Sequence, residues 1–282
     1  MSFRDRIIKP VFILSSPRSG STLLFETLSQ ARGLHTIGGE SHRAIESIPS
    51  LSPRSREWSS NRLTAAEATS AVAEQLARNF YEELHDRDGR PPDGSARMLE
   101  KTPKNALRVP FFDAVWPDSL FVYLYRDVRQ TLASMIEAWR SGRFRTYPKL
   151  PGWTAEPWSL LLVPGWSKLQ ELSLPEIVAH QWAIATNILL DDLEQLASER
   201  VRGIDYDRFL ADPHEQAASL ARSLDLQWDR QLPATLPCSR MTVSQPREGK
   251  WRAIGDIIGS VWPIVEQTDK RARAFRDRLQ QE

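Results

Sequence analysis

The feature that most constrains this chain is an apolar run that passes into a serine- and glycine-rich turn and then into a helical pattern. It is the segment Val11–Leu24, VFILSSPRSGSTLL. A strand, a loop and a helix in this order form the framework of a phosphate-binding loop. The reason is that the unpaired N–H groups and the dipole at the start of a helix attract an anion.

The turn supplies the groups that such a loop needs. Gly20 lets the backbone approach a bound anion closely, and Pro17 fixes the turn. Arg18 supplies positive charge. Further hydroxyl donors come from Ser19, Ser21 and Thr22. We therefore predict that residues 17–22 bind phosphate groups of a ligand.

The loop departs from the P-loop template G-x-x-x-x-G-K-[ST] at one informative position. Aligned on that template, Ser21 takes the place of the Lys, and Thr22 falls on the Ser/Thr position. In nucleotide triphosphatases the Lys reaches the β/γ-phosphates and the hydroxyl holds Mg²⁺. Because the loop cation is instead Arg18, the turn suits a ligand with a single 5′-phosphate that carries a transferable anionic group.

A second candidate anion site follows the apolar run Leu120–Tyr125, LFVYLY, which predicts a parallel strand buried on both faces. Arg126 would lie at the carboxyl end of this strand, where ligands bind in such sheets. Ser134 would lie about two turns along the following helix, on the same face. Arg126 could equally pair with Asp127. Taken together with the first loop, however, Arg126 and Ser134 favour a ligand with phosphates at two separate places.

Strands and helices alternate along the chain. We predict strands over residues 11–15, 97–100, 120–125 and 201–204, and helices ending near 31, over 64–85, 128–139 and 173–197, and over 269–281, with an irregular segment over 37–62. This alternation predicts an α/β fold: a doubly wound parallel sheet with helices on both faces. We expect a single domain over residues 1–282, with an insertion over 139–172.

The insertion is dense in Trp, Pro and Gly between Trp139 and Trp166. It could line a pocket for a partly apolar, hydroxylated acceptor, and a packed surface excursion is an equally good interpretation.

Composition excludes several function classes. The formal net charge of +1 gives no global attraction to nucleic acid or to a membrane surface. The single cysteine, Cys238, excludes an internal disulfide and a Cys-based zinc site, and no His spacing suggests a metal site. We expect no signal peptide, no transmembrane segment, no metal and a cytoplasmic location.

Five segments in order resemble the sulfotransferases that use 3′-phosphoadenosine 5′-phosphosulfate (PAPS). The segments are PRSGSTLL at 17–24, EKTPKN at 100–105, YRDVRQTLAS at 125–134, IDYDRFLADP at 204–213 and REGKWR at 247–252. PRSG, in place of the P-K-S-G of cytosolic steroid and phenol enzymes, is closer to bacterial and tyrosylprotein sulfotransferases. The resemblance implies sulfuryl transfer from PAPS to a hydroxyl group of a small-molecule or lipid acceptor.

The resemblance also implies roles for individual residues. In-line transfer needs cations at the departing phosphate and a base for the acceptor hydroxyl. Arg18 and Lys101 are the candidate cations, with Lys104 as an alternative. Glu40 is the favoured base and His42 remains open. A carboxylate base would need partial burial to raise its pKa.

Late residues of the chain are expected to close over the nucleotide. They are Arg247, Gly249, Lys250 and Trp251, with Tyr206 either against adenine or buried as a structural residue. Two other functions stay open from the sequence: a P-loop kinase of a small molecule, which would need ATP and Mg²⁺, and a nucleotide-binding scaffold without activity. The acceptor and the oligomeric state do not follow from the sequence.

Overall fold

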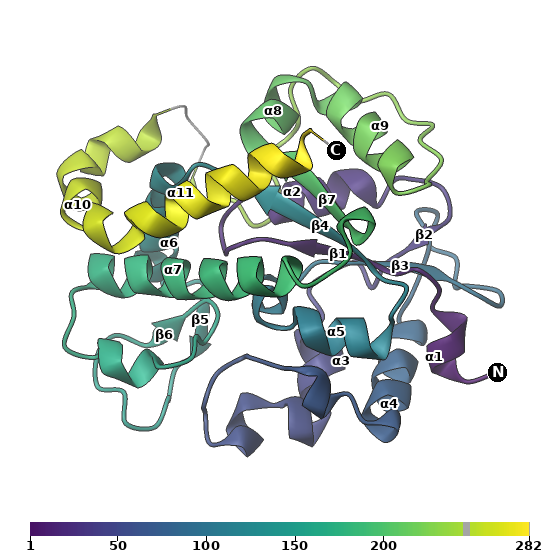
Figure 1. Cartoon of the computed structure of the whole chain (residues 1–282), viewed down its shortest axis with the longest axis horizontal. Helices are drawn as coiled ribbons and strands as arrows, with labels where there is room; N and C mark the ends of the chain where they lie inside the picture. Colours follow the sequence, from purple (N-terminus) through teal and green to yellow (C-terminus); the bar gives the residue numbers. More distant parts are fainter. Residues whose placement is uncertain (245–248, 282) are drawn as a thin grey trace.

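The protein is an α/β domain built around a parallel sheet, as the sequence predicts (Figure 1). The computed structural model describes residues 1–244 and 249–281. The sheet contains, in spatial order, β2 (Leu34–His35), β3 (Arg97–Glu100), β1 (Val11–Leu14), β4 (Leu120–Tyr125) and β7 (Val201–Asp205), all parallel to their neighbours. The carboxyl ends of β3, β1 and β4 therefore meet at one edge of the sheet.

Helices cover both faces of the sheet (Figure 1). They are α1 (Phe3–Arg6), α2 (Ser21–Leu28), α3 (His42–Glu46), α4 (Ser70–Tyr81), α5 (Val109–Val115), α6 (Val128–Ser141), α7 (Leu174–Leu193), α8 (Tyr206–Ala211), α9 (Pro213–Ser223), α10 (Gly255–Ser260) and α11 (Trp262–Leu279). Short 3₁₀ turns connect several of them.

The alternation of β1 shows why both faces are apolar. Phe12 and Leu14 pack into the core that contains α4, α5 and α11, whereas Val11 and Ile13 pack into the core that contains α2 and α9. Successive side chains of a strand point to opposite faces, so an all-apolar strand requires cover on both sides. The stacked rings of Phe12 and Phe112, with centroids 4.3 Å apart, join β1 to α5.

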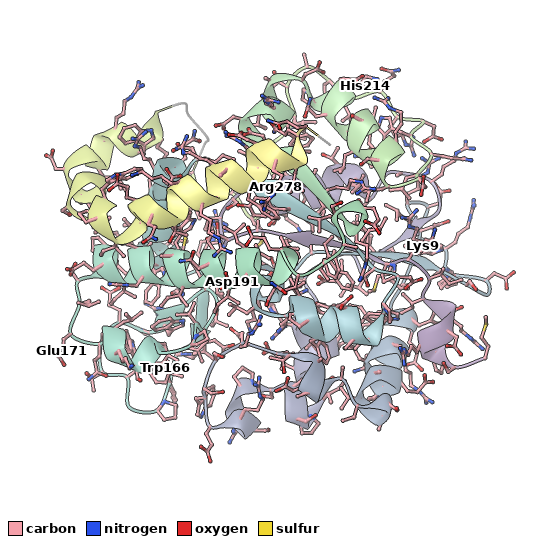
Figure 2. All side chains as sticks on the ribbon, in the orientation of Figure 1. Lys9, Trp166, Glu171, Asp191, His214 and Arg278 are labelled. Carbon is pink, nitrogen blue, oxygen red and sulfur yellow. The ribbon has the colours of Figure 1, made fainter. Side chains whose placement is uncertain are left out.

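The insertion forms a separate apolar layer beside α6 and α7. Its two short strands, β5 (Arg145–Tyr147) and β6 (Trp158–Ser159), pair antiparallel. The tryptophans pack on one another and into a buried cluster with both helices; the ring centroids of Trp158 and Trp139 are 5.4 Å apart. Trp166 lies on the far side of this layer from the sheet (Figure 2). Most of the aromatic surface in the insertion is therefore consumed by packing.

Several element boundaries differ from the sequence prediction. The Thr64–Glu67 capping box forms, but it encloses only a 3₁₀ turn, and α4 begins separately at Ser70 with Thr69 as its cap. The first long helix, α2, ends at Leu28, because the Arg32 amide already donates to the carbonyl of Gln227 in a bridge between segments.

Other differences concern the later part of the chain. The capping box at Ser173 is present as predicted, but α7 ends at Leu193, and α11 begins at Trp262. Helices α5, α9 and α10 were not predicted, nor were the short helices α1 and α3 earlier in the chain. Helix α5 has only seven residues, most of them apolar, so the sequence carries no helical periodicity there.

Candidate active site

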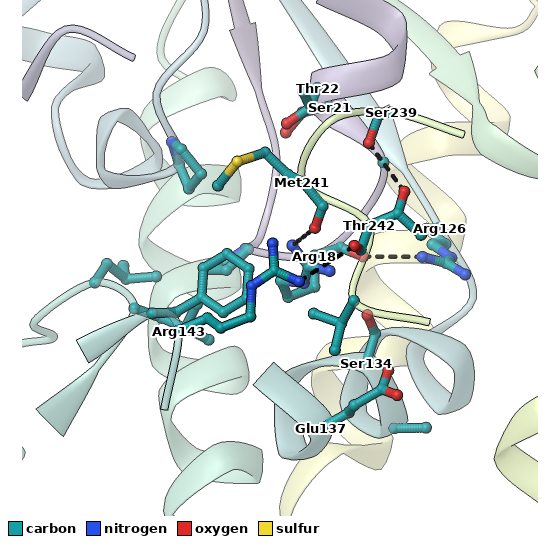
Figure 3. Close-up of a pocket in the computed structure, with 18 of the residues that line it drawn as sticks. Arg18, Ser21, Thr22, Arg126, Ser134, Glu137, Arg143, Ser239, Met241 and Thr242 are labelled. Carbon is teal, nitrogen blue, oxygen red and sulfur yellow. Dashed lines mark hydrogen bonds between the residues drawn. The ribbon is translucent and has the colours of Figure 1, made fainter. Parts of the chain in front are cut away.

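The predicted site residues converge on one cavity at the carboxyl ends of the strands, with a volume of about 360 Å³ (Figure 3). Those that line it are Pro17, Arg18, Gly20, Ser21, Thr22, Glu40, His42, Arg126, Ser134, Tyr206, Lys250 and Trp251. Three others, Ser19, Lys101 and Gly249, lie outside the lining, and Arg247 falls outside the described residues. The cavity thus joins segments that are more than 200 residues apart in the chain.

The loop after β1 has a conformation that only glycine can supply at one position. Gly20 has φ of 94° and is the N-cap of α2. A Cβ atom placed there would lie 2.0 Å from Cε2 of Tyr206. Both the positive φ and the contact with Tyr206 therefore require glycine. Ser21 and Thr22 follow as the first residues of α2, where backbone N–H groups are free to meet an anion.

Arg18 is held in place by two later segments of the chain. Its Nη1 donates to the carbonyl of Met241 at 3.0 Å, and its guanidinium lies 4.6 Å from the centroid of the Phe144 ring. Burial lowers the pKa of Arg18, and the nearby charge of Arg126 lowers it further. An anion in the cavity would relieve this repulsion, because opposite charge favours the protonated guanidinium.

Ser19 behaves differently from its neighbours. Its hydroxyl is 2.7 Å from the hydroxyl of Ser16, and the side chain is buried. This hydrogen bond closes the turn on itself. In the free protein the Ser19 hydroxyl is thus engaged within the turn, and its contact with a ligand stays a prediction.

Arg126 lies under the loop, at the end of β4. Its Nη1 donates to the carbonyl of Arg18 at 2.9 Å, its Nη2 to Gln130 at 3.2 Å, and its Nε is buried without a partner in the described residues. It forms no ion pair with Asp127, which instead caps α6 and pairs with Arg273 at 3.0 Å. The arginine is therefore left available to an anion, with Ser134 in the same cavity wall.

Tyr206 is a buried structural residue that also borders the cavity. It is 6% exposed, and its ring lies against Gly20 and 4.7 Å from the guanidinium carbon of Arg126. Burial raises the pKa of its hydroxyl. Between the two roles that the sequence left open, the described contacts favour the structural one: this ring fixes the loop and Arg126 relative to each other.

The segment after residue 249 contributes one wall of the cavity. Gly249, with φ of 65°, begins a 3₁₀ turn over Lys250–Ile254 and does not itself line the cavity. Lys250 donates to Glu137 of α6 at 2.7 Å. The ring of Trp251 lies 5.3 Å from the guanidinium carbon of Arg129. These contacts place the segment along α6, from Arg129 near its start to Glu137 in its third turn.

Glu40 and Lys101 form the polar centre of the site. Glu40 Oε1 accepts from Lys101 Nζ at 2.6 Å, and Glu40 Oε2 accepts from His42 Nε2 at 2.9 Å. The same ammonium donates to the Thr22 hydroxyl at 3.1 Å. The Lys101 side chain is 1% exposed and that of Glu40 is 23% exposed. Lys101 thus reaches the phosphate loop from behind and connects it to the carboxylate that the cavity exposes.

The pKa of Glu40 contradicts one expectation from the sequence. Burial alone would raise it, but the hydrogen bond from His42 and the charge of Lys101 outweigh burial and lower the pKa to about 2. The carboxylate is therefore ionised at neutral pH and able to accept a proton, although in this conformation it is a weaker base than expected.

Glu100, one residue before Lys101, fixes this centre from beneath. It accepts hydrogen bonds from the hydroxyls of Ser41 at 2.5 Å and Thr102 at 2.6 Å, and also one from the amide of Asn105. The Ser41 amide in turn donates to the Thr102 hydroxyl at 2.8 Å. All of these side chains are buried. The network ties the turn that carries Glu40 to the end of β3 that carries Lys101, and the sequence analysis did not identify it.

Lys104, the alternative to Lys101, occupies a different part of the cavity wall. Its ammonium pairs with Glu46 at 2.7 Å and lies 5.0 Å from the ring centroid of Tyr147. Burial lowers its pKa, which Glu46 only partly restores, to about 8. Arg108 binds the same carboxylate at 3.0 Å. Lys104 therefore belongs to the side of the insertion, while Lys101 belongs to the phosphate loop.

Further residues of the cavity wall were not named individually from the sequence. Six lie in the insertion that was expected to line an acceptor pocket: Arg143, Phe144, Arg145, Thr146, Leu160 and Leu161. Three lie in segments that carry the family resemblance: Pro103, Gln130 and Ala133. No motif indicated the remaining six, which are Glu137, Ser239, Met241, Thr242, Val243 and Ser244. Within the described ranges no group of His, Cys, Asp and Glu side chains could hold a metal ion, and none of the helices there is long and apolar enough to cross a membrane.

Comparison with known proteins identifies relatives of this arrangement. A model described as "Sulfotransferase family" matches residues 10–230. A putative protein-tyrosine sulfotransferase of Caenorhabditis briggsae is 23% identical over 79% of this chain and 67% of its own length. Protein-tyrosine sulfotransferase A of Caenorhabditis elegans is 23% identical over 78% of this chain and 50% of its own length. The similarity thus spans about half to two thirds of these relatives.

Solved structures of sulfotransferases share the fold. One from Mycobacterium avium has a TM-score of 0.53 at 14% identity and covers 93% of this chain and 76% of its own. One from Alicyclobacillus acidocaldarius has a TM-score of 0.51 at 14% identity and covers 95% of this chain and 97% of its own. At these identities the likeness concerns the fold alone.

Proposed function

Because this chain belongs to the sulfotransferase family, we propose that it transfers a sulfuryl group from PAPS to a hydroxyl of an acceptor. The observation that carries this proposal is the contact of one buried ammonium, Lys101, with both the phosphate loop at Thr22 and the carboxylate of Glu40. It brings a cation for the leaving group and a base for the acceptor to one point.

Each of the two anion sites would bind one of the two phosphate-bearing ends of the donor. The loop residues, with Arg18, would hold the 5′-phosphosulfate, and Arg126 with Ser134 would hold the 3′-phosphate. Trp251 and Lys250 border the remaining wall and would cover the nucleotide. Of the cations in this assignment, Arg18 and Arg126 form no ion pair within the described residues, whereas Lys250 is paired with Glu137.

In the reaction the acceptor oxygen forms a bond to sulfur while the bond from sulfur to the bridging phosphate oxygen breaks. The electron pair of that bond stays with the phosphate, giving 3′-phosphoadenosine 5′-phosphate. Lys101 and Arg18 stabilise this developing charge. Glu40 accepts the proton of the acceptor hydroxyl, and His42, bonded to the other carboxylate oxygen, holds Glu40 in place.

The low pKa of Glu40 in the free protein is compatible with this role. Negative charge from bound phosphosulfate beside Lys101 raises the pKa of a neighbouring carboxyl group, because it disfavours the ionised form. Glu40 therefore becomes a stronger base when the donor is present. His42 is the less suitable base, since Nε2 is taken by Glu40 and Nδ1 is buried.

The same geometry argues against a P-loop kinase. In that class the hydroxyl aligned with Thr22 holds Mg²⁺. Here that hydroxyl accepts from a lysine ammonium, whose charge would repel a metal ion at the same place. The absence of the P-loop Lys, together with Arg126 at the end of β4, agrees with this conclusion.

The test combines nucleotide binding with turnover. We expect isothermal titration calorimetry to show that 3′-phosphoadenosine 5′-phosphate binds in the presence of EDTA. We also expect ³⁵S to be transferred from labelled PAPS to members of a panel of hydroxylated small molecules and lipids. We expect Glu40→Gln to lower kcat by about 10²- to 10⁴-fold with nucleotide affinity retained. Glu83→Gln, which removes an exposed carboxylate, is the matched control.

Each failure points to a different alternative. Binding of ATP that depends on Mg²⁺, without binding of the bisphosphate nucleotide, would support the kinase. Nucleotide binding without transfer to any panel member would support the inactive scaffold. Unchanged turnover in Glu40→Gln would show that Glu40 is not the base, but it would not contradict the proposed transfer reaction. The cytoplasmic location stays a prediction.

A further inference from the structure

The cavity wall formed by residues 143–146, which packs against Arg18 through Phe144, carries more positive charge than the donor requires. The charged residues that line the cavity are Arg18, Lys104, Arg126, Arg143, Arg145 and Lys250 on the positive side and Glu40 and Glu137 on the negative side. Glu137 pairs with Lys250, and Glu46 behind the wall pairs with Lys104. Arg18 and Arg126 are assigned to the donor. Two arginines of the insertion, Arg143 and Arg145, remain.

Neither of these two arginines has a carboxylate partner in residues 1–244 and 249–281. Within the described residues, the guanidinium of Arg143 makes one long hydrogen bond, 3.5 Å from Nη1 to the carbonyl of Thr242 (Figure 3). The guanidinium of Arg145 lies against Gly142, at the end of α6. Both side chains are exposed to the solvent. Two exposed guanidinium groups on one wall of a binding cavity are a ready partner for a carboxylate or another oxyanion.

The wall that carries them is the one beside the proposed base. Phe144, between the two arginines, packs on Arg18 and accepts a hydrogen bond from the Leu160 amide at 3.0 Å. Lys104, whose ammonium lies against Tyr147 of β5, lines the cavity together with His42. An acceptor whose hydroxyl reaches Glu40 would therefore lie along residues 143–146.

The geometry points to an acceptor that is a small hydroxylated molecule carrying an oxyanion, such as a carboxylate, which Arg143 and Arg145 bind. This inference rests on the proposed function, since it names the acceptor class of the same site. The cavity, about 360 Å³, must hold part of the donor as well, which leaves space for a compact acceptor rather than for a polypeptide. The tryptophans of the insertion, by contrast, are used in packing and do not line it.

The charge of the acceptor can be varied independently of its hydroxyl group. We would compare hydroxylated carboxylates with their own amides, for example 4-hydroxyphenylacetate and 3-hydroxybutyrate against the corresponding amides, using ³⁵S-labelled PAPS. We expect kcat/KM to be about 10- to 100-fold higher for the carboxylate of a pair, as for a charge-assisted hydrogen bond.

Variants then assign that preference to the insertion. Arg143→Gln/Arg145→Gln should abolish the carboxylate preference, and Arg145→Lys should retain part of it, because charge remains while the bidentate geometry is lost. Arg140→Gln is the matched control. Arg140 is an exposed arginine near the end of α6, a few residues before Arg143, and it does not line the cavity. The Kd of 3′-phosphoadenosine 5′-phosphate, measured in parallel, separates effects on the donor from effects on the acceptor.

The inference is overturned by equal turnover of carboxylate and amide in the wild type, or by a preference that survives the double variant. Exclusive use of acidic tyrosine peptides would overturn the small-molecule class. If no member of the panel is turned over, saturation-transfer NMR can measure whether the carboxylates bind to the complex of the protein with 3′-phosphoadenosine 5′-phosphate. Binding to the wild type that is lost in the double variant supports the inference, and no binding to the wild type rejects it. Failure of the nucleotide itself to bind would instead reject the proposed function.

Discussion

Lys101 Nζ lies 2.6 Å from Glu40 Oε1, so the proposed leaving-group cation and the proposed base are one ion pair in the free protein. Glu40 is a weaker base in this state, because the hydrogen bond from His42 and the charge of Lys101 outweigh burial and favour its ionised form. An anionic donor that interacts with the Lys101 ammonium would raise the pKa of Glu40. The first prediction measures this coupling.

We expect nucleotide binding to be accompanied by proton uptake at Glu40. In the free protein the pKa of Glu40 is about 2, so at pH 5 the carboxyl group is fully ionised. Bound 3′-phosphoadenosine 5′-phosphate raises that pKa, because its negative charge disfavours the ionised carboxylate, so a fraction of a proton is taken up. Calorimetry in buffers of different ionisation enthalpy measures it. Because the phosphates and other groups also titrate, the quantity compared is wild type minus Glu40→Gln, and a difference of zero contradicts the coupling.

Glu100→Gln tests whether the buried network positions Glu40. Ser41 and Thr102 both donate to Oε1 of Glu100, and the Asn105 amide donates to Oε2, so the NH2 group of a Gln at this position must face one of these donors. We expect a loss of about 1–3 kcal/mol in the free energy of unfolding. We also expect a fall in kcat of roughly tenfold, with the Kd of the nucleotide unchanged. A variant that is less stable but keeps the wild-type kcat would show a purely structural role.

Gly20→Ala tests the close contact beneath the phosphate loop. Alanine at this φ costs about 1–2 kcal/mol, and its Cβ would also collide with Tyr206, 2.0 Å away. Gly33→Ala is the matched control, because Gly33 also has positive φ but nothing lies within 4 Å of its Cβ position. We therefore expect both variants to be less stable in urea unfolding, and only Gly20→Ala to lose nucleotide binding. Equal effects of the two substitutions would argue against the role of Tyr206.

Arg126→Gln tests the assignment of the 3′-phosphate. We expect the Kd of 3′-phosphoadenosine 5′-phosphate to increase by about 10- to 100-fold, as for loss of a charge-assisted hydrogen bond. The affinity for adenosine 5′-phosphosulfate, which lacks the 3′-phosphate, should decrease much less in the same variant. A parallel loss for both nucleotides would indicate that Arg126 acts by holding the loop through the Arg18 carbonyl instead.

Much of the fold could be predicted because its elements are encoded locally. The uninterrupted apolar runs at Val11–Leu14 and Leu120–Tyr125 are long enough to identify buried parallel strands. The capping box at Ser173 likewise marks the start of α7. Boundaries failed where a contact distant in the chain sets them, as at Arg32, whose amide pairs with Gln227.

For the site, the sequence indicated which residues gather but not how they interact. Glu40 and Lys101 were identified through family resemblance, and the structure brings them together; their catalytic roles stay predictions. The sign of the Glu40 pKa shift could not be predicted from the sequence. It depends on Lys101 and His42 approaching to hydrogen-bonding distance, which overcomes the opposite effect of burial.

The sequence by itself determined the strand, loop and helix of residues 11–28, the parallel sheet and the family of this protein. Each depends on short-range patterns: an apolar strand, a glycine where φ is positive, and motifs in a fixed order. Only the tertiary structure decided the partners of Arg18, the network around Glu100 and the position of Arg143 and Arg145 in the cavity wall. These contacts join residues far apart in the chain, and their energies depend on burial and distance, which a linear pattern does not specify.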